Sequence, residues 1–286
     1  MPELPEVETV RRILDPLITG RRVEEVHLGD FPSVLETTLC AADPIALLIG
    51  RTITHTARRG KYLFLPLDAD LTLIVHLRMT GRLLILPSEA EPVRFQHLAI
   101  RLDNGYDLRF GDQRKFGRVT VAHNQAVTDL NARLGPEPDG GALTPQFLLD
   151  RMARRPGKVK NAMLDQGLIA GLGNIYVDEA LFRARIHPEQ PANSLTLDDC
   201  KRLLRAIRHV INGALANQGT TFSTFENPYG EAGSNAAFLR VYGKTRGAGH
   251  CDRCGTPLER IFVGGRGTTF CPTCQVLPNR SPDPVP

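Results

Sequence analysis

The chain has 286 residues, which is enough for two domains with cores of their own, and 42% of them are hydrophobic, as in an ordinary globular protein. Its net charge is only +4, from 35 basic and 31 acidic residues, so charge alone singles out no class of partner. No apolar run reaches the ~20 residues of a membrane span, and the start, MPELPEVETVRR, lacks the apolar core of a signal peptide. We therefore expect a cytoplasmic protein without a membrane partner, and six cysteines without an export signal argue against a disulfide framework.

The first half of the chain predicts one helix followed by strands. Pro5 suits a first helical turn, and an apolar face follows it at Val7, Val10, Ile13 and Leu14. From about residue 22 to 121 the pattern changes to short β-like runs separated by turn formers, such as 62–65, 71–75, 83–86 and 119–121. We expect residues 1–133 to form an antiparallel β-sandwich or barrel with flanking helices.

The second half predicts mainly helices, which makes the chain an α+β protein of two domains. Residues 134–143 are rich in Gly and Pro and predict a linker. A helical domain is expected over 144–240, and it ends in a long mobile loop, 219–238, rich in Gly, Ser, Thr and Asn. The expected helices cover residues 144–155, 159–168, 175–184 and 194–218, with tight turns at Gly167, Gly171 and Gly173. A cysteine module occupies 245–275, and we expect the tail, 276–286, to be disordered.

The cysteine module has the spacing of a zinc site. Cys251-x2-Cys254 and Cys271-x2-Cys274 are separated by sixteen residues, within the range of four-thiolate sites. Four protein ligands complete a tetrahedron and leave no position for water, so the spacing predicts one structural Zn²⁺. The glycine-rich tip between the pairs carries Arg266, which could approach a phosphate closely or lie in solvent as part of a plain turn.

The N-terminus contains a possible nucleophile. Removal of Met1, favoured by a small second residue, leaves a secondary α-amine on Pro2. An α-amino group has a pKa of about 8 against about 10.4 for lysine, so more of it is unprotonated at neutral pH and able to form an imine. Glu3 follows directly and Glu6 lies one helical turn further, where a carboxyl group could transfer protons. Taken alone, this pattern is weak, because most N-terminal prolines are inert.

Seven motifs follow one another along residues 1–275: MPELPEVETVRR, RRGKYLFL, HLRMTGRL, DQRKFG, GLGNIYVDEALF, HP and GRGTTFCPTCQ. In this order they resemble the formamidopyrimidine-DNA glycosylase family, the bacterial enzymes for 8-oxoguanine and ring-opened purines. The resemblance implies that Pro2 attacks the sugar C1′ to expel the base and that Glu3 protonates the opening sugar or the leaving group. It further implies that Lys61 assists β-elimination and that Arg266 holds a phosphate during δ-elimination.

The resemblance also implies the DNA contacts. A stacked base is out of reach of these groups, so the nucleotide has to be flipped out at a cost of a few kcal/mol. Met79, Arg114 and Phe116 match the residues that fill the resulting void. The loop 219–238 corresponds to the segment that closes over the extruded base. Backbone contacts are implied for Asn174, in a helix–two-turn–helix motif, and for Lys160 and Arg155. A DNA contact is also implied for His97, although Phe95 stands where many members carry a first histidine.

Basic residues gather at 58–61, 114–115 and 151–160, compatible with a groove along a phosphate backbone, although each cluster alone could be a solvated face.

Three readings of the sequence remain open, of which an enzyme for oxidised purines is the first. A relative of endonuclease VIII would act on oxidised pyrimidines, but Leu4 and the void-filling set favour the purine enzyme. A zinc-finger DNA-binding protein without activity is the third reading. We expect the partner to be double-stranded DNA with oxidised purines or abasic sites and the chain to act as a monomer.

Overall fold

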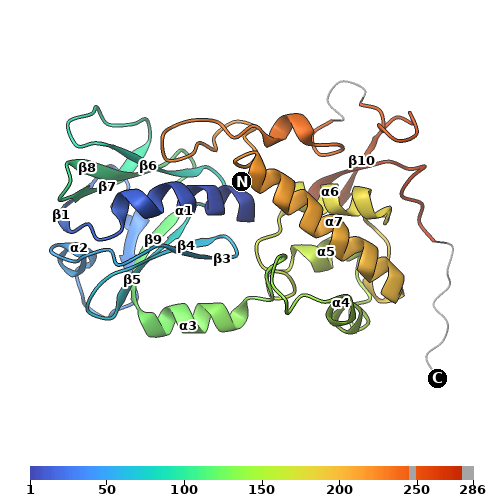
Figure 1. Ribbon diagram of the computed structural model, residues 1–286, viewed down its shortest axis with the longest axis horizontal. Helices are drawn as coiled ribbons and strands as arrows, with labels where there is room; N and C mark the ends of the chain where they lie inside the picture. The colour runs from blue at the N-terminus through green and yellow to red at the C-terminus, as the bar shows by residue number, and fades with distance from the viewer. Residues whose placement is uncertain (245–248, 279–286) are drawn as a thin grey trace. The chain divides into compact units, whose positions relative to one another are not determined.

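The computed structural model describes residues 1–244 and 249–278. They form two compact units (Figure 1). Unit 1 comprises residues 1–133 and 214–236, and unit 2 comprises residues 134–213 together with the described part of 237–278. Within the described residues, no helix is both long and apolar enough to cross a membrane.

Unit 1 is built on two β-sheets. The first has the strand order β1-β7-β8-β6 and is antiparallel throughout (Val23–Leu28, Gln96–Leu102, Tyr106–Asp112 and Gly81–Pro87). The second has the order β2-β9-β5-β4-β3 (Leu35–Thr37, Arg118–His123, Leu71–His76, Tyr62–Pro66 and Ala57–Arg59). The predicted antiparallel sandwich is therefore confirmed apart from one edge, where β2 pairs parallel with β9.

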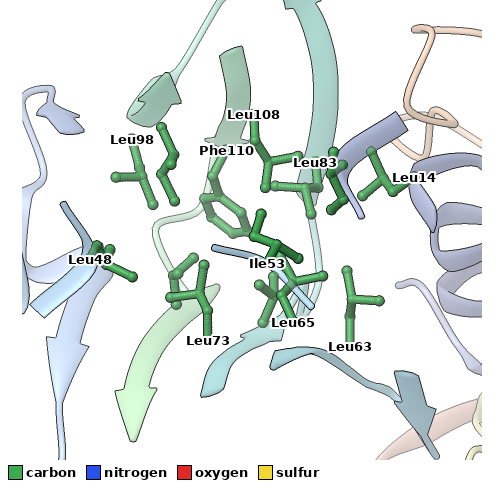
Figure 2. Packing of buried hydrophobic residues seen from close by; sticks show 14 of the residues in the cluster. Leu14, Leu48, Ile53, Leu63, Leu65, Leu73, Leu83, Leu98, Leu108 and Phe110 are labelled. Carbon is green, nitrogen blue, oxygen red and sulfur yellow. The ribbon is translucent and has the colours of Figure 1, made fainter. Parts of the chain in front are cut away.

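The core of unit 1 lies between the two sheets. Leu63, Leu65 and Leu73 of the second sheet face Leu83, Leu108 and Phe110 of the first (Figure 2). Helix α1 (Leu4–Ile18) adds Val7, Val10, Leu14 and Ile18 to the same cluster, each at most 1% exposed. Each such buried side chain contributes about 1.5–3 kcal/mol, so the core fixes the helix that starts beside the N-terminus.

The sequence gives little indication of two helices in unit 1. Helix α2 (Pro44–Leu48) is capped by the carboxylate of Asp43, which accepts a hydrogen bond from the backbone N–H of Ile45. Helix α3 (Asn124–Arg133) directly follows β9 and has no buried residue, and the sequence analysis did not anticipate it. Its polar composition resembles that of a loop, which is why periodicity does not reveal it.

Residues 214–236 belong to unit 1, whereas the sequence analysis placed them in the helical domain. The backbone N–H of Ile85 donates to the carbonyl of Pro228, and Arg82 forms an ion pair with Glu226 at 2.7 Å. The backbone N–H of Thr220 donates to the Glu6 carboxylate at 2.7 Å. These contacts join the loop 219–238, predicted to close over the extruded base, to the sheet and to α1. The order of residues along the chain does not show such contacts.

The described part of unit 2 contains four α-helices and a β-hairpin. The helices are α4 (Pro145–Met152), α5 (Val159–Leu164), α6 (Asn174–Ala184) and α7 (Leu197–Ala216), the last of which runs on into the segment that belongs to unit 1. The hairpin joins β10 (Glu259–Val263) to β11 (Arg266–Phe270). All four predicted helices exist, but α5 ends before the predicted residue 168, because the Asp165 side chain accepts from the N–H of Gly167 and forms a turn.

The predicted linker is attached to unit 2. Gly135 donates its N–H to the carbonyl of Gln166, the carbonyl of Pro136 accepts from Ala170, and Leu143 is completely buried. The predicted tail has no regular structure over residues 276–278, and its remaining residues, 279–286, lie outside the described part, as do residues 245–248 of the cysteine module.

The packing of α1 predicts the effect of truncating one of its side chains. Leu14→Ala removes a completely buried side chain and leaves a cavity, so it should lower the free energy of unfolding by about 2–5 kcal/mol. Leu28→Ala is the matched control, because Leu28 is 36% exposed and its truncation should cost less than about 1 kcal/mol. Urea denaturation measures both, and equal losses would contradict the packing described here.

Candidate active site and zinc centre

The N-terminal residues of the chain are buried and held in place. Pro2 is buried, Met1 is 38% exposed, and Glu3 is 1% exposed as the N-cap of α1. Glu3 and Glu6 form a capping box, in which the Glu6 carboxylate accepts the backbone N–H of Glu3 at 2.7 Å and the Glu3 side chain accepts the N–H of Glu6. A chain end usually frays, but here Glu3, which directly follows Pro2, is held in place.

Glu6 also joins the N-terminus to the predicted capping loop. One carboxylate oxygen accepts from Glu3 and the other accepts from the backbone N–H of Thr220 at 2.7 Å. Glu6 is 1% exposed, so both hydrogen bonds are shielded from water. A buried carboxylate that bonds two separate segments fixes their relative position within unit 1, which agrees with the supporting role predicted for Glu6.

Lys61 lies in a tight turn beside α1. Lys61 follows Gly60 between β3 and β4 and is 8% exposed. Helix α1 packs against both strands. Glu8 anchors this turn: it accepts from Arg58 at 3.0 Å, and Arg58 also donates to the carbonyl of Gly60. Burial opposes ionisation of Glu8, but hydrogen bonds from Arg11, Arg12 and Arg58 outweigh it and lower the pKa to about 2. Glu8 therefore stays charged at working pH, and its contribution to stability is lost only as the pH falls from about 4.5 towards 2.

His76 is a candidate that the sequence analysis missed. Its ring lies 4.6 Å from that of Tyr62, and its Nδ1 accepts the backbone N–H of Arg78 at 3.0 Å. Burial, followed by the charges of Arg78 and Lys61, lowers its pKa to about 3, so the ring is neutral at pH 7. Because Nδ1 accepts, the proton lies on Nε2, which makes His76 a neutral hydrogen-bond donor beside Lys61. The HLRMTGRL motif contains it, but residue type alone does not show this placement.

The three predicted void-filling residues are exposed in unit 1. Met79 is 37% and Phe116 49% exposed, and the Arg114 guanidinium lies 4.7 Å from the centre of the Phe116 ring. Periodicity alone would have placed Met79 and Phe116 in the core. Their segments also contain Arg78 and Lys115 in left-handed conformations, with φ of 53° and 58°. Such strain costs about 1–3 kcal/mol per residue and tends to occur where a segment has a task besides folding.

Asp112 organises these segments, and the sequence analysis did not single it out. One oxygen of its carboxylate accepts from the Thr80 hydroxyl and from the N–H of Arg114, and the other accepts from Phe116 and Gly117 at 2.8 and 2.7 Å. Thr80 follows Met79, so one buried carboxylate ties the Met79 turn to the loop of Arg114 and Phe116.

His97 lies in the interior, at variance with the predicted DNA contact. It is 3% exposed, and its Nε2 is 2.9 Å from the carbonyl oxygen of Asp112. It therefore supports the residue that holds the void-filling loop. Phe95, two residues earlier, is 38% exposed. The contact of His97 with DNA stays a prediction, and its burial argues against it.

In unit 2 the four predicted cysteines form one cluster. Their sulfur atoms all lie within 4.8 Å of one another, with Cys251–Cys274 at 3.8 Å and Cys254–Cys271 at 3.5 Å. Four sulfurs about 2.3 Å from a tetrahedral zinc ion are about 3.8 Å apart, so the cluster fits Zn²⁺. Of the two cysteines outside the cluster, Cys200 is buried and Cys40 is exposed.

The zinc-binding hairpin presents Arg266 beside its tip. Gly264 and Gly265 form a two-residue turn with φ of 56° and 72°, a conformation typical of tight hairpins and favourable for glycine. A Cβ on Gly264 would lie 2.3 Å from the side-chain oxygen of Asn161, so the turn is pressed against α5. Arg266 is exposed, and Asn174, at the start of α6, donates to the carbonyl of Gly267 at 3.0 Å.

Two predicted backbone contacts of unit 2 differ in accessibility. Arg155 is partly exposed and donates to Asp165 at 2.8 Å, so it remains able to reach a phosphate. Lys160 is 0% exposed and lies 2.6 Å from the carboxylate of Asp178. The predicted contact between the Lys160 side chain and DNA is thus not supported, because the ammonium group points into the protein.

These features define a class of protein: a β-sandwich with a buried proline at position 2, joined in one chain to a helical unit with a four-cysteine zinc finger. Family models match in the same order. Residues 1–119 match the formamidopyrimidine-DNA glycosylase N-terminal domain, residues 134–226 match the formamidopyrimidine-DNA glycosylase H2TH domain, and residues 250–276 match the zinc finger found in FPG and IleRS.

Similar proteins extend this match over nearly the whole chain. Formamidopyrimidine-DNA glycosylase of Herpetosiphon aurantiacus is 44% identical over 277 residues, which are 96% of this chain and 100% of the relative. A mutant of Lactococcus lactis FPG, in complex with Fapy-dG-containing DNA, is 35% identical with a TM-score of 0.86, over 96% of this chain and all of that one. MutM in complex with carbocyclic 8-oxo-G-containing DNA is 35% identical with a TM-score of 0.87, also over 96% of this chain and all of that one. The chain belongs to the formamidopyrimidine-DNA glycosylase family.

The bonds of Asp112 predict that it controls void filling. Asp112→Asn replaces an acceptor oxygen with an amino group and should break at least one of the bonds to Arg114, Phe116 and Gly117. We expect a loss of about 1–3 kcal/mol in unfolding free energy and at least about tenfold weaker binding of a lesion duplex. Denaturation and fluorescence anisotropy measure the two effects. Asp70→Asn is the control, because the Asp70 side chain is 71% exposed, and an equal loss of binding there would contradict this role.

The cysteine cluster predicts the consequence of losing zinc. Cys254→Ser should reduce bound zinc from one ion per chain to none, unfold the finger and weaken duplex binding at least about tenfold. Cys40→Ser, at an exposed cysteine outside the cluster, should change neither quantity. Metal analysis and binding titrations decide the matter; undiminished binding by a zinc-free Cys254→Ser protein would show that the finger is dispensable.

Proposed function

We propose that the chain is a base-excision repair enzyme that removes oxidised purines, 8-oxoguanine and formamidopyrimidines, from double-stranded DNA and then cleaves the abasic strand. The observation that carries the proposal is the buried Pro2 followed by the capping box of Glu3 and Glu6, in a chain of this family. The relatives in complex with Fapy-dG and 8-oxo-G DNA support the choice of purine lesions.

Base removal starts at the N-terminus. Once Met1 has been removed, the Pro2 nitrogen donates its lone pair to C1′, the glycosidic bond breaks, and the base leaves with the bonding electrons and a proton. Opening of the sugar ring then forms an iminium between Pro2 and C1′, and Glu3 protonates the ring oxygen. Glu6 keeps Glu3 in position and adds no chemistry of its own.

Strand cleavage uses the acidity that the iminium confers. Loss of a proton from C2′ breaks the C3′–O bond and releases the 3′ phosphate, and Lys61 assists by proton donation or phosphate contact. Loss of a proton from C4′ then breaks the C5′–O bond, and the Arg266 guanidinium compensates the charge of the departing phosphate. Zinc has a structural role only, because four thiolates leave no coordination position for water.

The lesion becomes accessible only when it leaves the duplex. Met79 and Phe116 replace the lost stacking, and Arg114 pairs with the orphaned base. Asn174 and Arg155 contact the phosphate backbone, and the segment 219–238 covers the extruded nucleotide. The exposure of Met79, Arg114 and Phe116 supports this division of roles.

The proposal extends to the setting of the enzyme. It acts as a monomer in the bacterial cytoplasm, on duplex DNA with oxidised purines or abasic sites. The bacterial origin of the relatives supports the location. One N-terminal proline and one finger per chain supply every proposed role, so a second copy is not needed.

Borohydride trapping tests the proposal. Reduction of the iminium should join the enzyme covalently to a duplex with 8-oxoguanine opposite cytosine. A form with two extra residues before Pro2 should give no trapped product, because the amine becomes an amide, while its duplex affinity stays within about twofold. Absence of trapping by correctly processed protein would favour a binding protein without activity. Preferential cutting of thymine-glycol duplexes would instead assign the chain to the oxidised pyrimidines.

A further inference from the structure

A buried ion pair in unit 2 has no part in the chemistry proposed above. Lys160 of α5 is 0% and Asp178 of α6 is 2% exposed, and the Lys160 Nζ atom lies 2.6 Å from an Asp178 oxygen. Two charges are costly to remove from water, and such pairs are often replaceable by apolar residues without loss of stability. A pair in this position therefore calls for a role beyond stability, and its contacts indicate one.

Both members of the pair bond to the strand that begins with Arg266. The Lys160 ammonium donates to the Thr268 hydroxyl at 2.7 Å and to the carbonyl of Gly267 at 3.3 Å. The Thr268 hydroxyl in turn donates to the carbonyl of Arg266 at 3.1 Å. On the other side, Asp178 accepts the backbone N–H of Thr269 at 3.2 Å.

The pair thus fixes the backbone of residues 266–269, the first four of β11. The turn before them is already pressed against α5, where a Cβ on Gly264 would meet Asn161 at 2.3 Å. Along this fixed stretch of backbone, the side chain of Arg266 remains exposed. A long, flexible guanidinium can meet a phosphate at a defined place only if its own backbone is fixed.

We propose that Lys160 and Asp178 are positioning residues, which set the place of Arg266 through the backbone of β11 and thereby govern the second strand cleavage. The inference rests on the proposed function and adds to it two residues that touch neither the base nor the sugar. The neutralised pair does not attract DNA; it holds the residue that does. The pair bonds to β11, and no step proposed for base removal uses β11, so base excision should continue when the pair is lost.

The test separates the first elimination from the second. Under single-turnover conditions with a 5′-labelled 8-oxoguanine duplex, the β-product ends in an unsaturated aldehyde and the δ-product ends in a phosphate. Lys160→Met and Asp178→Asn should each raise the ratio of β- to δ-product at least about fivefold, while the rate of borohydride trapping stays within about twofold of wild type. Burial raises the pKa of Asp178, so its carboxyl should be protonated in Lys160→Met, and that variant buries no bare charge.

Lys201→Met is the matched control. Lys201 lies on α7 outside the basic clusters, its side chain is 52% exposed, and it forms a surface ion pair with Asp198, so its loss should leave the product ratio unchanged. Lys160→Arg, which keeps the charge, should restore part of the δ-product. Zinc content at one ion per chain shows that each variant keeps its finger. Should Lys160→Met lose zinc, Asp178→Asn and Lys160→Arg carry the comparison.

A double variant distinguishes positioning from general weakening. If Lys160 acts through Arg266, then Lys160→Met combined with Arg266→Ala should give the same product ratio as Arg266→Ala alone. A further rise in the double variant, or a wild-type ratio in zinc-containing Lys160→Met and Asp178→Asn, would overturn the positioning role. Failure of the wild-type enzyme to be trapped would instead contradict the proposed function, and the two failures are therefore distinguishable.

Discussion

The chemistry depends on holding a chain terminus still. A secondary amine at the end of a polypeptide is normally mobile, and a mobile nucleophile loses most of the advantage of being in the same molecule as its proton donor. Here Glu6 removes that freedom. Its two oxygens accept from Glu3 and from Thr220, both at 2.7 Å, in a position closed to water. One carboxylate therefore fixes the residue after the amine together with the segment proposed to cover the lesion.

The same device recurs at three further segments that carry side chains with proposed roles. Asp112 accepts hydrogen bonds from both void-filling segments, Glu8 holds the turn that carries Lys61, and Asp178 holds the strand that carries Arg266. Buried carboxylates suit this task, because each accepts several hydrogen bonds and can therefore fix the chain on either side of the residue that it presents. Zinc would do the equivalent for the hairpin, because its four cysteine ligands join the chain before β10 to the chain after β11.

The sequence revealed the parts whose chemistry is local. Cysteine spacing predicted the zinc cluster, alternating apolar runs predicted the sandwich, and the ordered motifs identified the family; all three are confirmed. The burial of individual side chains could not be predicted from the sequence, because it depends on partners that are distant in the chain. Lys160 looks like a surface lysine until Asp178 lies opposite it, and His97 looks available until the carbonyl of Asp112 occupies its ring nitrogen. The sequence analysis placed residues 214–236 in the helical domain instead of unit 1 for the same reason, because Thr220 and Glu6 are 214 positions apart.

The most direct measurement is to locate the covalent bond. After trapping with borohydride on an 8-oxoguanine duplex and digestion with trypsin and nuclease, mass spectrometry identifies the peptide that carries the sugar remnant. The account predicts a modified peptide that begins at Pro2 and ends at Arg11, with Met1 absent. A remnant on Lys61 or on any other lysine, or trapping by a chain that retains Met1, would contradict it.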